Sequence, residues 1–295
     1  MKKIIMGVDE LPKSDHLTLL LGNFDGVHLG HYELVKDAKR NGEGELGVML
    51  FDQNPAIFLK RKSQNILTSL EDKIRIFASY GFDYAYVLPL TEALLKKSKD
   101  DFIHDYIEPL SPTLLVVGED YSFGAEGKGN ASDLSEKYPT HVVPLKTVNG
   151  EKIGTQEIIR LLEEGKIKEA NEFLGRPYEI HGTVINGFHN GNKLGFPTAN
   201  LSLSSPYVIP RSGVYKTLSY VRGVPHLSMT NIGDNPTFGL LNHPTIETYI
   251  TNFHENIYNE TLYLEFVDYL REETKFSSLE ELIEQLKRDE ASLYR

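Results

Sequence analysis

The sequence contains no cysteine, which excludes disulfide bonds, thiolate metal ligands and cysteine nucleophiles. Long apolar stretches are also missing, because no segment approaches the roughly 18 apolar residues of a membrane span. Residues 1–9 carry basic side chains but too short an apolar run for a signal peptide. We therefore expect a soluble, cytoplasmic protein that does not enter a membrane.

Positive charge is in short supply. The chain has 31 Lys and Arg residues against 42 Asp and Glu residues, which gives a formal net charge of −11 at pH 7. A nucleic-acid partner normally requires a basic face, so this balance argues against one. Any anionic ligand must instead be held by a local arrangement of donors.

The length of 295 residues predicts about two domains of roughly 150 residues each. Nearly continuous apolar runs recur through the first half with helical patterns between them, as in parallel strands that are covered on both faces. This alternation predicts a doubly wound α/β sheet. The runs are residues 17–21, 46–51, 84–88 and 114–117, with a weaker one at 141–145.

One intervening helix is marked by its ends. Thr68-Ser69-Leu70-Glu71 has the form of a capping box, and Gly81 can end the helix that it begins. Between them, Leu70, Ile74 and Phe77 share one face.

The first chemical motif is Gly22-Asn23-Phe24-Asp25-Gly26-Val27-His28-Leu29-Gly30-His31, directly after the run 17–21. A buried strand, a glycine-rich turn and a helix N-terminus form an anion site, because free backbone N–H groups point outward there. His28 and His31 lie on one side of the first helical turn, and Gly30 lets a ligand approach the backbone. The motif can cradle nucleotide phosphates. The alternative is a plain strand–turn–helix connection with two surface histidines.

A second motif, Gly118-Glu119-Asp120-Tyr121-Ser122-Phe123-Gly124, follows the run 114–117. Ligands of doubly wound sheets bind at the carboxyl ends of the strands, where both motifs lie. In a loop shaped around a ring, Asp120 can hydrogen-bond a ribose or a base. Equally, Asp120 can make an Asx turn in which the aromatic side chains simply pack.

The pattern changes after a helical linker that ends at residues 174–178. Short alternating runs rich in β-forming residues then follow without helices between them, which predicts an antiparallel sheet or small barrel. A capped amphipathic segment from Ser278 predicts a final helix. We expect a first domain at 1–165, a linker to about 178 and a second domain at 178–295.

A glycine-punctuated stretch at 187–200 contains Gly191 and Gly195, and the backbone N–H groups of such a loop can wrap phosphates. Thr198 and Asn200 are two apart, so on an extended stretch their oxygens face the same way. Such hard oxygen ligands suit Mg²⁺ that also touches ATP phosphates. The alternative is a hairpin loop with a turn at Pro197.

The two motifs of the first half resemble the adenylyltransferase half of the bacterial bifunctional riboflavin kinase/FMN adenylyltransferases, or FAD synthetases, which belong to the H-x-G-H nucleotidylyltransferases. The resemblance implies that His28 and His31 hold ATP phosphates and stabilise the charge that builds on the α-phosphorus. The phosphate of FMN would attack, without a protein nucleophile. The implied nucleotide-binding residues of these motifs are Gly22, Asn23, Phe24, Asp25, Gly30, Gly118, Asp120 and Phe123.

Two segments depart from this family's pattern. The Phe-x-Pro-His-Pro segment reads Phe51-Asp52-Gln53-Asn54-Pro55, so Gln53 and Asn54 replace its proline and histidine. In the segment that corresponds to Ile-Ser-Ser-Thr-x-Ile-Arg, only Thr155 keeps a hydroxyl for the ATP phosphates. Arg160 stands one place later than the pattern expects, which is about 100° around a helix and enough to aim it elsewhere.

In the second half, Pro197-Thr198-Ala199-Asn200 resembles a specific signature of the riboflavin kinases. Residues 231–238 with Glu247 resemble the kinase pattern Asn-Ile-Gly-x-x-Pro-Thr-Phe followed by Glu-x-His. This implies that Glu247 is the base that takes the proton from the ribityl 5′-hydroxyl of riboflavin. Taken by itself, Glu247 is more readily interpreted as a strand glutamate that faces solvent. Arg271 matches the family's C-terminal segment next to the flavin.

The resemblance covers nearly the whole chain and implies an enzyme that uses ATP and Mg²⁺ to convert riboflavin into FMN and FMN into FAD. In the kinase half, Tyr249 replaces the usual histidine, and Asn190 and Asn192 stand where bacterial members often carry arginines. The alternatives are a relative with one of the two activities and a silent regulatory paralogue that binds flavin or nucleotide. The retained motif residues argue against a silent copy.

Overall fold

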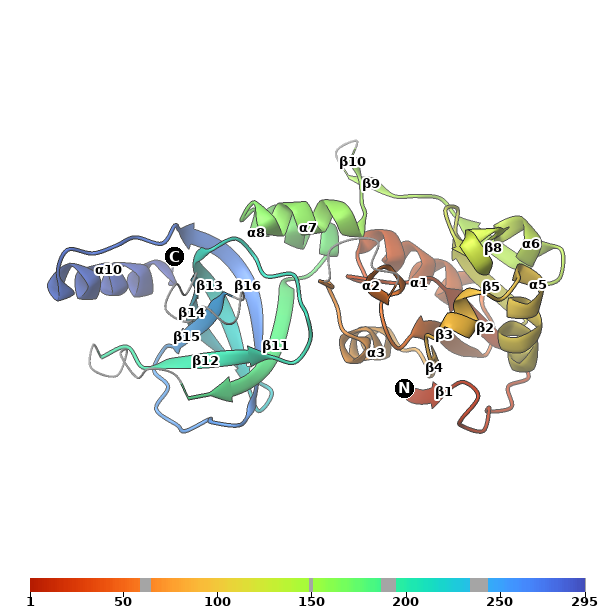
Figure 1. Cartoon of the computed structure of the whole chain (residues 1–295), viewed down its shortest axis with the longest axis horizontal. Coiled ribbons are helices and arrows are strands. Elements are labelled where there is room, and N and C mark those ends of the chain that lie inside the picture. The colour runs from red at the N-terminus through yellow and green to blue at the C-terminus, as the bar shows by residue number, and fades with distance from the viewer. Residues whose placement is uncertain (59–64, 149–150, 187–194, 234–243, 295) are drawn as a thin grey trace. The chain divides into compact units, whose positions relative to one another are not determined.

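The computed structural model describes residues 1–58, 65–148, 151–186, 195–233 and 244–294. The chain divides into two compact units, Met1–Thr155 and Gln156–Arg295, whose elements are labelled in Figure 1. The expected domain limits at 165 and 178 stay a prediction. Within the described ranges, no helix is both long and apolar enough to cross a membrane.

The first unit is built on a six-stranded sheet in the order β1-β4-β3-β2-β5-β8. Every ladder in it is parallel, and the predicted apolar runs are confirmed as its strands. β1 is not indicated by the sequence pattern, because two of its four residues are exposed lysines. The strands are β1 (Lys2–Ile5), β2 (Leu17–Leu21), β3 (Glu45–Phe51), β4 (Tyr84–Leu88), β5 (Leu114–Gly118) and β8 (Thr140–Val143).

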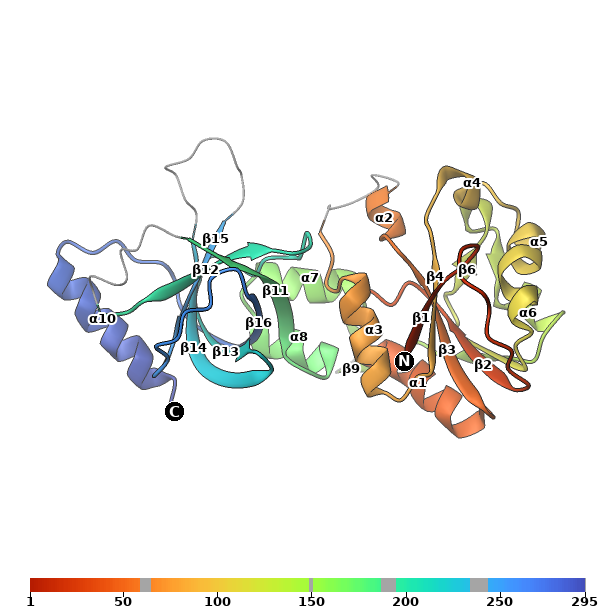
Figure 2. The same ribbon diagram turned by 90° about the horizontal axis from the view of Figure 1, so that it is seen from below.

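Helices cover both faces of this sheet (Figure 2), which confirms the doubly wound prediction. Val35 and Phe77 of α1 (Leu29–Asn41) and α3 (Leu70–Ser79) are buried on one face. On the other face, α4 (Glu92–Leu95), α5 (Lys99–Phe102) and α6 (Ala131–Ser135) contribute the buried side chains Leu94, Phe102 and Leu134. The unit's remaining short elements are α2 (Pro55–Phe58), η1 (Ile103–Ile107), η2 (Glu108–Leu110), β6 (Ser122–Phe123), η3 (Ala125–Gly127), β7 (Gly129–Asn130), β9 (Thr147–Val148) and β10 (Glu151–Lys152).

The start of α3 differs by one residue from the predicted capping box. Ser69, not Thr68, is the N-cap, and its hydroxyl accepts a hydrogen bond from the Asp72 N–H. The carboxylate that returns to the cap is Asp72, not Glu71. The shift has a physical reason, because the Thr68 hydroxyl already accepts a hydrogen bond from the Gly26 N–H at 2.8 Å. Thr68 therefore ties the start of α3 to the loop before α1.

The boundary between the units lies at the first residue of α7 (Thr155–Glu163). The second unit contains the rest of α7 and α8 (Ile167–Leu174), and six antiparallel strands then close into a barrel. The prediction of an antiparallel sheet or barrel with a final helix is confirmed. The barrel closes because β11 pairs with the last strand, β16, as well as with β12. The elements are β11 (Tyr178–Ile185), β12 (Thr198–Leu203), β13 (Gly213–Val221), β14 (Val224–Gly233), β15 (Thr245–Ile250), β16 (Thr261–Arg271) and α10 (Leu279–Ser292).

Hydroxyl side chains form a network inside the barrel. Thr217 Oγ1 lies 2.8 Å from both Ser228 Oγ and Thr230 Oγ1. Ser219 extends the network to Ser228 at 2.7 Å, and Thr248 extends it to Thr230 at 2.9 Å. These side chains are at most 1% exposed, so each hydroxyl depends on its neighbours for hydrogen bonds.

We expect Thr217→Val to destabilise the barrel by about 1–3 kcal/mol, because valine keeps the volume and removes both hydrogen bonds of this hydroxyl. The measurement is scanning calorimetry, in which the two units can unfold separately. Thr261→Val, at an exposed position of β16, is the matched control and should leave stability nearly unchanged. Equal shifts in the two variants would contradict a stabilising role of the network.

Candidate functional site

His28 and His31 form a stacked pair at the start of α1. His28 is the N-cap, and its ring Nδ1 accepts a hydrogen bond from the His31 N–H at 3.4 Å. The ring centroids lie 3.7 Å apart and the planes differ by 17°. A Cβ on Gly30 would lie 3.0 Å from the His28 ring, so glycine leaves room for that ring. The two imidazoles therefore lie at the positive end of a helix, which favours an anion.

The backbone before His28 has an unusual conformation. Phe24 and Val27 have φ angles of 52° and 39°, in the left-handed region that is costly for residues other than glycine. Both side chains are fully buried. The Phe24 ring meets His31 and Phe77 edge-on, at centroid distances of 5.2 and 5.1 Å. Phe24 thus supports the histidine pair from the core.

Asp25 fixes this loop to neighbouring segments. Its carboxylate is buried and accepts hydrogen bonds from the N–H groups of Leu67 and Thr68 at 3.0 and 3.1 Å. The Asn54 side-chain amide donates to the same carboxylate at 3.3 Å, from the position where the family pattern has a histidine. Burial raises the pKa of Asp25, and the ammonium of Lys73 opposes the rise. The hydrogen bonds of Asp25 therefore join three segments.

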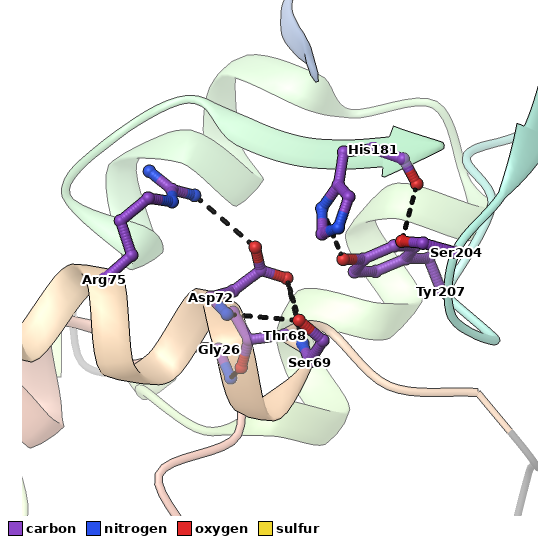
Figure 3. A network of polar contacts seen from close by, with 8 residues as sticks. All are labelled: Gly26, Thr68, Ser69, Asp72, Arg75, His181, Ser204 and Tyr207. Atoms are coloured by element: carbon purple, nitrogen blue, oxygen red, sulfur yellow. Dashed lines mark hydrogen bonds and ion pairs between the residues drawn. The ribbon is translucent and has the colours of Figure 1, made fainter. Parts of the chain in front are cut away.

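Two supporting residues, Thr68 and Lys73, were not found by sequence reasoning. Lys73 is buried in α3, and its Nζ donates to the Asn23 carbonyl oxygen at 2.8 Å. Thr68 lies beside Gly26 (Figure 3), and its hydroxyl accepts a hydrogen bond from the Gly26 N–H. Burial lowers the pKa of Lys73, while two carboxylates nearby raise it. In the sequence, Thr68 and Lys73 belong only to a predicted capped helix start. That local pattern does not indicate which distant backbone groups they contact.

Thr155 reaches the same loop from the end of the first unit. Its hydroxyl donates to the Asp25 carbonyl oxygen at 3.2 Å. Arg160, on α7, is paired instead with Glu157 and with Glu164, the latter at 2.7 Å. The structure therefore brings Thr155 to the histidine loop and directs Arg160 to acidic residues of its own segment.

The loop after β5 adjoins the histidine loop, because β5 is the parallel neighbour of β2. Gly118 ends β5, and the exposed Asp120 follows it. Phe123 is buried and packs against Phe102 and Tyr121, at centroid distances of 5.4 and 5.8 Å. Phe123 thus supports the loop from the core, and Asp120 lies on the exposed side of this loop.

In the second unit, Thr198, Asn200 and Glu247 gather on the outer face of the barrel. Asn200 on β12 is paired with Glu247 on β15, and Thr198 is paired with Tyr249. Glu247 is half-buried, and the Thr198 hydroxyl is hydrogen-bonded to its carboxylate. Burial raises the pKa of Glu247, the Thr198 hydrogen bond opposes the rise, and the charge of Glu273 adds to it. This environment favours a carboxylate that accepts protons readily.

The other predicted residues of this unit are described only in part. Gly191 lies outside the described residues, as do Asn190 and Asn192, whereas Gly195 is described with a φ of 81°. Asn231, on β14, faces Glu247 from the other side of β15.

Arg271, at the end of β16, is turned toward α10. Its Nε and Nη2 lie 2.9 and 2.7 Å from Asp289 Oδ2, and Asp289 is buried. Gln285 donates to the same carboxylate at 2.7 Å. The place of Arg271 beside the flavin stays a prediction. Sequence reasoning did not find Asp289, because an acidic residue on an amphipathic helix has no sequence signal for a partner 18 residues away.

Comparisons with known proteins agree across both units. Residues 11–160 match the FAD synthetase family model, and residues 174–295 match the riboflavin kinase model. Bifunctional riboflavin kinase/FMN adenylyltransferases of Listeria monocytogenes, Bacillus subtilis and Escherichia coli strain K12 are 39%, 35% and 30% identical to the chain. The matches cover 92%, 94% and 98% of this chain and 90%, 91% and 96% of those relatives.

A solved structure shares the fold. A crystal structure of a protein from Streptococcus pneumoniae, described as a macrolide-efflux protein, matches with a TM-score of 0.89 and 29% identity. The match covers 99% of each chain. This likeness concerns the fold, and the efflux description applies to that protein.

Together, the fold and these matches define a transferase of two modules, in which an α/β domain of the FAD synthetase type precedes a riboflavin kinase barrel. The chain belongs to the bifunctional riboflavin kinase/FMN adenylyltransferase family. The resemblance drawn from the motifs is thereby confirmed over both halves.

We expect Thr198→Val to raise the pKa of Glu247 further, because the variant removes the hydrogen bond that stabilises the ionised carboxylate. The measurement is an NMR titration of the glutamate carboxyl carbons, with the Glu247 signal identified by its absence in Glu247→Gln. Ser202→Ala, at an exposed position on β12, is the control and should leave this pKa unchanged. An unchanged or lower pKa in Thr198→Val would contradict the hydrogen bond.

Proposed function

We propose that the two reactions of this family take place at two separate sites, one in each unit. As a member of the family, the chain is a transferase with riboflavin kinase and FMN adenylyltransferase activities, and ATP is the co-substrate of both. The first site rests on the stacked pair of His28 and His31 at a helix N-terminus. The second rests on Glu247, half-buried beside Thr198. We place both reactions in the cytoplasm.

In adenylyl transfer, a phosphate oxygen of FMN attacks the α-phosphorus of ATP, and pyrophosphate leaves to give FAD. His28 and His31 hold the ATP phosphates and stabilise the charge that develops, together with N–H groups of the first turn of α1. Positioning and electrostatic stabilisation supply the catalysis without a protein nucleophile. In this proposal Thr155 and Asp120 border the nucleotide, at the edge of the sheet where β2 and β5 end.

In riboflavin phosphorylation, Glu247 takes the proton of the ribityl 5′-hydroxyl as its oxygen attacks the γ-phosphorus of ATP, and ADP leaves to give FMN. The raised pKa makes Glu247 a stronger base than an exposed glutamate. Only the ionised carboxylate accepts a proton, so the kinase rate is lost as the pH falls through this raised pKa. The acid limb of the kinase profile therefore lies at a higher pH than the pKa of an ordinary glutamate.

The proposal includes Mg²⁺ held by Thr198 and Asn200. Thr198 and Asn200 lie on one face of β12, and Glu247 is the residue opposite Asn200 on the neighbouring strand β15. These are the hard oxygen donors that Mg²⁺ prefers. When bound, the ion would offset charge on the ATP phosphates. In the described ranges no group of three or more His, Asp or Glu side chains is arranged to hold a metal, so ATP and water would supply the remaining ligands.

We expect the purified protein with riboflavin, ATP and Mg²⁺ to yield FMN and then FAD, which chromatography resolves. Glu247→Ala should slow the first step by at least about 100-fold, because the base is lost. His28→Ala should slow the conversion of supplied FMN into FAD by at least about 100-fold, because the phosphates lose a stabilising partner. Each variant should keep the other activity.

The two variants are controls for one another, because every preparation is assayed for both steps. An equal loss of both activities in either variant would contradict separate sites. If the unaltered protein phosphorylates riboflavin but makes no FAD from FMN, it is a monofunctional kinase. If it makes FAD from FMN but does not phosphorylate riboflavin, it is an adenylyltransferase. Flavin binding without any nucleotide product would favour the regulatory paralogue.

We expect Asn200→Ala to raise the Mg²⁺ concentration needed for half-maximal kinase rate by about tenfold or more, because a ligand oxygen is removed. The measurement is a Mg²⁺ titration of riboflavin phosphorylation at saturating ATP. Ser202→Ala, two residues along the same strand and exposed, is the matched control. An unchanged Mg²⁺ requirement in Asn200→Ala would refute this ligand assignment.

A further inference from the structure

Lys73 is a buried lysine that neither proposed mechanism uses. It lies in the N-terminal turn of α3 with 4% of its surface exposed. Its Nζ donates to the Asn23 carbonyl oxygen at 2.8 Å, and the charges of Asp25 and Asp72 act on it. A buried ammonium is costly unless it is paired and hydrogen-bonded. These partners offset that cost and fix the direction of the side chain.

The carbonyl that Lys73 holds stands directly before the strained part of the histidine loop. Phe24, the next residue, and Val27 are both left-handed, and such conformations cost about 1–3 kcal/mol each and persist only where their surroundings hold them. Between these two residues, the Gly26 N–H is held by the Thr68 hydroxyl at 2.8 Å. Hydrogen bonds from the start of α3 therefore hold the loop at Asn23, before Phe24, and at Gly26, after it.

His28 follows Val27 directly, so the loop conformation decides where the His28 ring lies. That ring caps α1 and stacks on the ring of His31 at 3.7 Å. We propose that Lys73 is a positioning residue for adenylyl transfer, which acts through the Asn23 carbonyl to keep the two histidines in their reactive arrangement. This inference rests on the adenylyl transfer proposed above for the histidine pair.

Three substitutions separate the hydrogen bond of Lys73 from its charge and from α3 in general. Lys73→Met keeps much of the side-chain length and removes both the donor and the charge. Lys73→Gln removes the charge and keeps an N–H donor on a side chain one atom shorter. Arg75→Met is the matched control, because it removes a half-exposed positive charge from the same helix, where Arg75 pairs with Asp72 at 3.5 Å (Figure 3).

The experiment measures both activities of the full chain in each variant. In Lys73→Met we expect kcat of adenylyl transfer to fall by about tenfold or more, because small displacements of reacting groups are costly. KM for FMN should change little, because the loss concerns the arrangement of the histidines. Lys73→Gln should lose less than Lys73→Met. The riboflavin kinase rate of every variant should stay within about twofold of the unaltered protein, because that site is independent.

Proton–nitrogen correlation NMR of the histidine rings gives a readout that does not depend on turnover. The signals of His28 and His31 are identified by their absence in the corresponding alanine variants. We expect both sets of signals to shift in Lys73→Met and to stay in place in Arg75→Met. This pattern is expected of a change in ring arrangement and not of a general loss of stability.

An unaltered rate of adenylyl transfer in Lys73→Met would overturn the inference. A parallel loss of both activities would also overturn it, because that outcome indicates general destabilisation. If Lys73→Met does not fold, Lys73→Gln decides, since a selective loss of adenylyl transfer supports the role and an unchanged rate overturns it. If the unaltered chain makes no FAD from FMN, the proposed adenylyl transfer fails. The ring signals then decide alone, because a shift supports positioning by Lys73 and no shift overturns it.

Discussion

The first site depends on the hydrogen bonds that the buried carboxylate of Asp25 accepts. Two of the donors are backbone N–H groups that lie 42 and 43 residues further along the chain, and the third is the side-chain amide of Asn54. These bonds help to hold the two left-handed residues that lead into α1. If the loop relaxed to ordinary angles, His28 would no longer cap the helix or stack on His31. The histidine pair therefore depends on several segments at one edge of the sheet, not on its own decapeptide.

The second unit positions its residues by strand register. Alternate residues of each strand point to opposite sides, so Thr248 joins the interior hydroxyls while Glu247 lies on the outer face. The neighbours of Glu247 are fixed by the two ladders of β15, Asn200 on one side and Asn231 on the other. A base held by ladders on both sides is more rigid than one on a loop. The two sites thus reach a defined geometry by different means.

The motifs and the sheet were predictable because their signals are local. Continuous apolar runs mark parallel strands, and the string from Gly22 to His31 carries its own helix start. The supporting contacts were not predictable, because Thr68 and Lys73 meet the histidine loop only after the chain has folded. The one-residue error at the cap of α3 has the same origin. Thr68 resembles a cap in the sequence, but its hydroxyl is engaged by a distant backbone N–H.

The closure of the barrel affects the order in which the two units can fold during synthesis. The first unit has all six strands of its sheet once β8 has been synthesised, and its core can form early. β11, by contrast, is the first strand of the barrel, but its second edge is paired only after β16 has been synthesised. The ion pair between Arg271 and Asp289 comes later still. During synthesis, a folded first domain therefore precedes a barrel whose edge strands remain unpaired until β16 emerges.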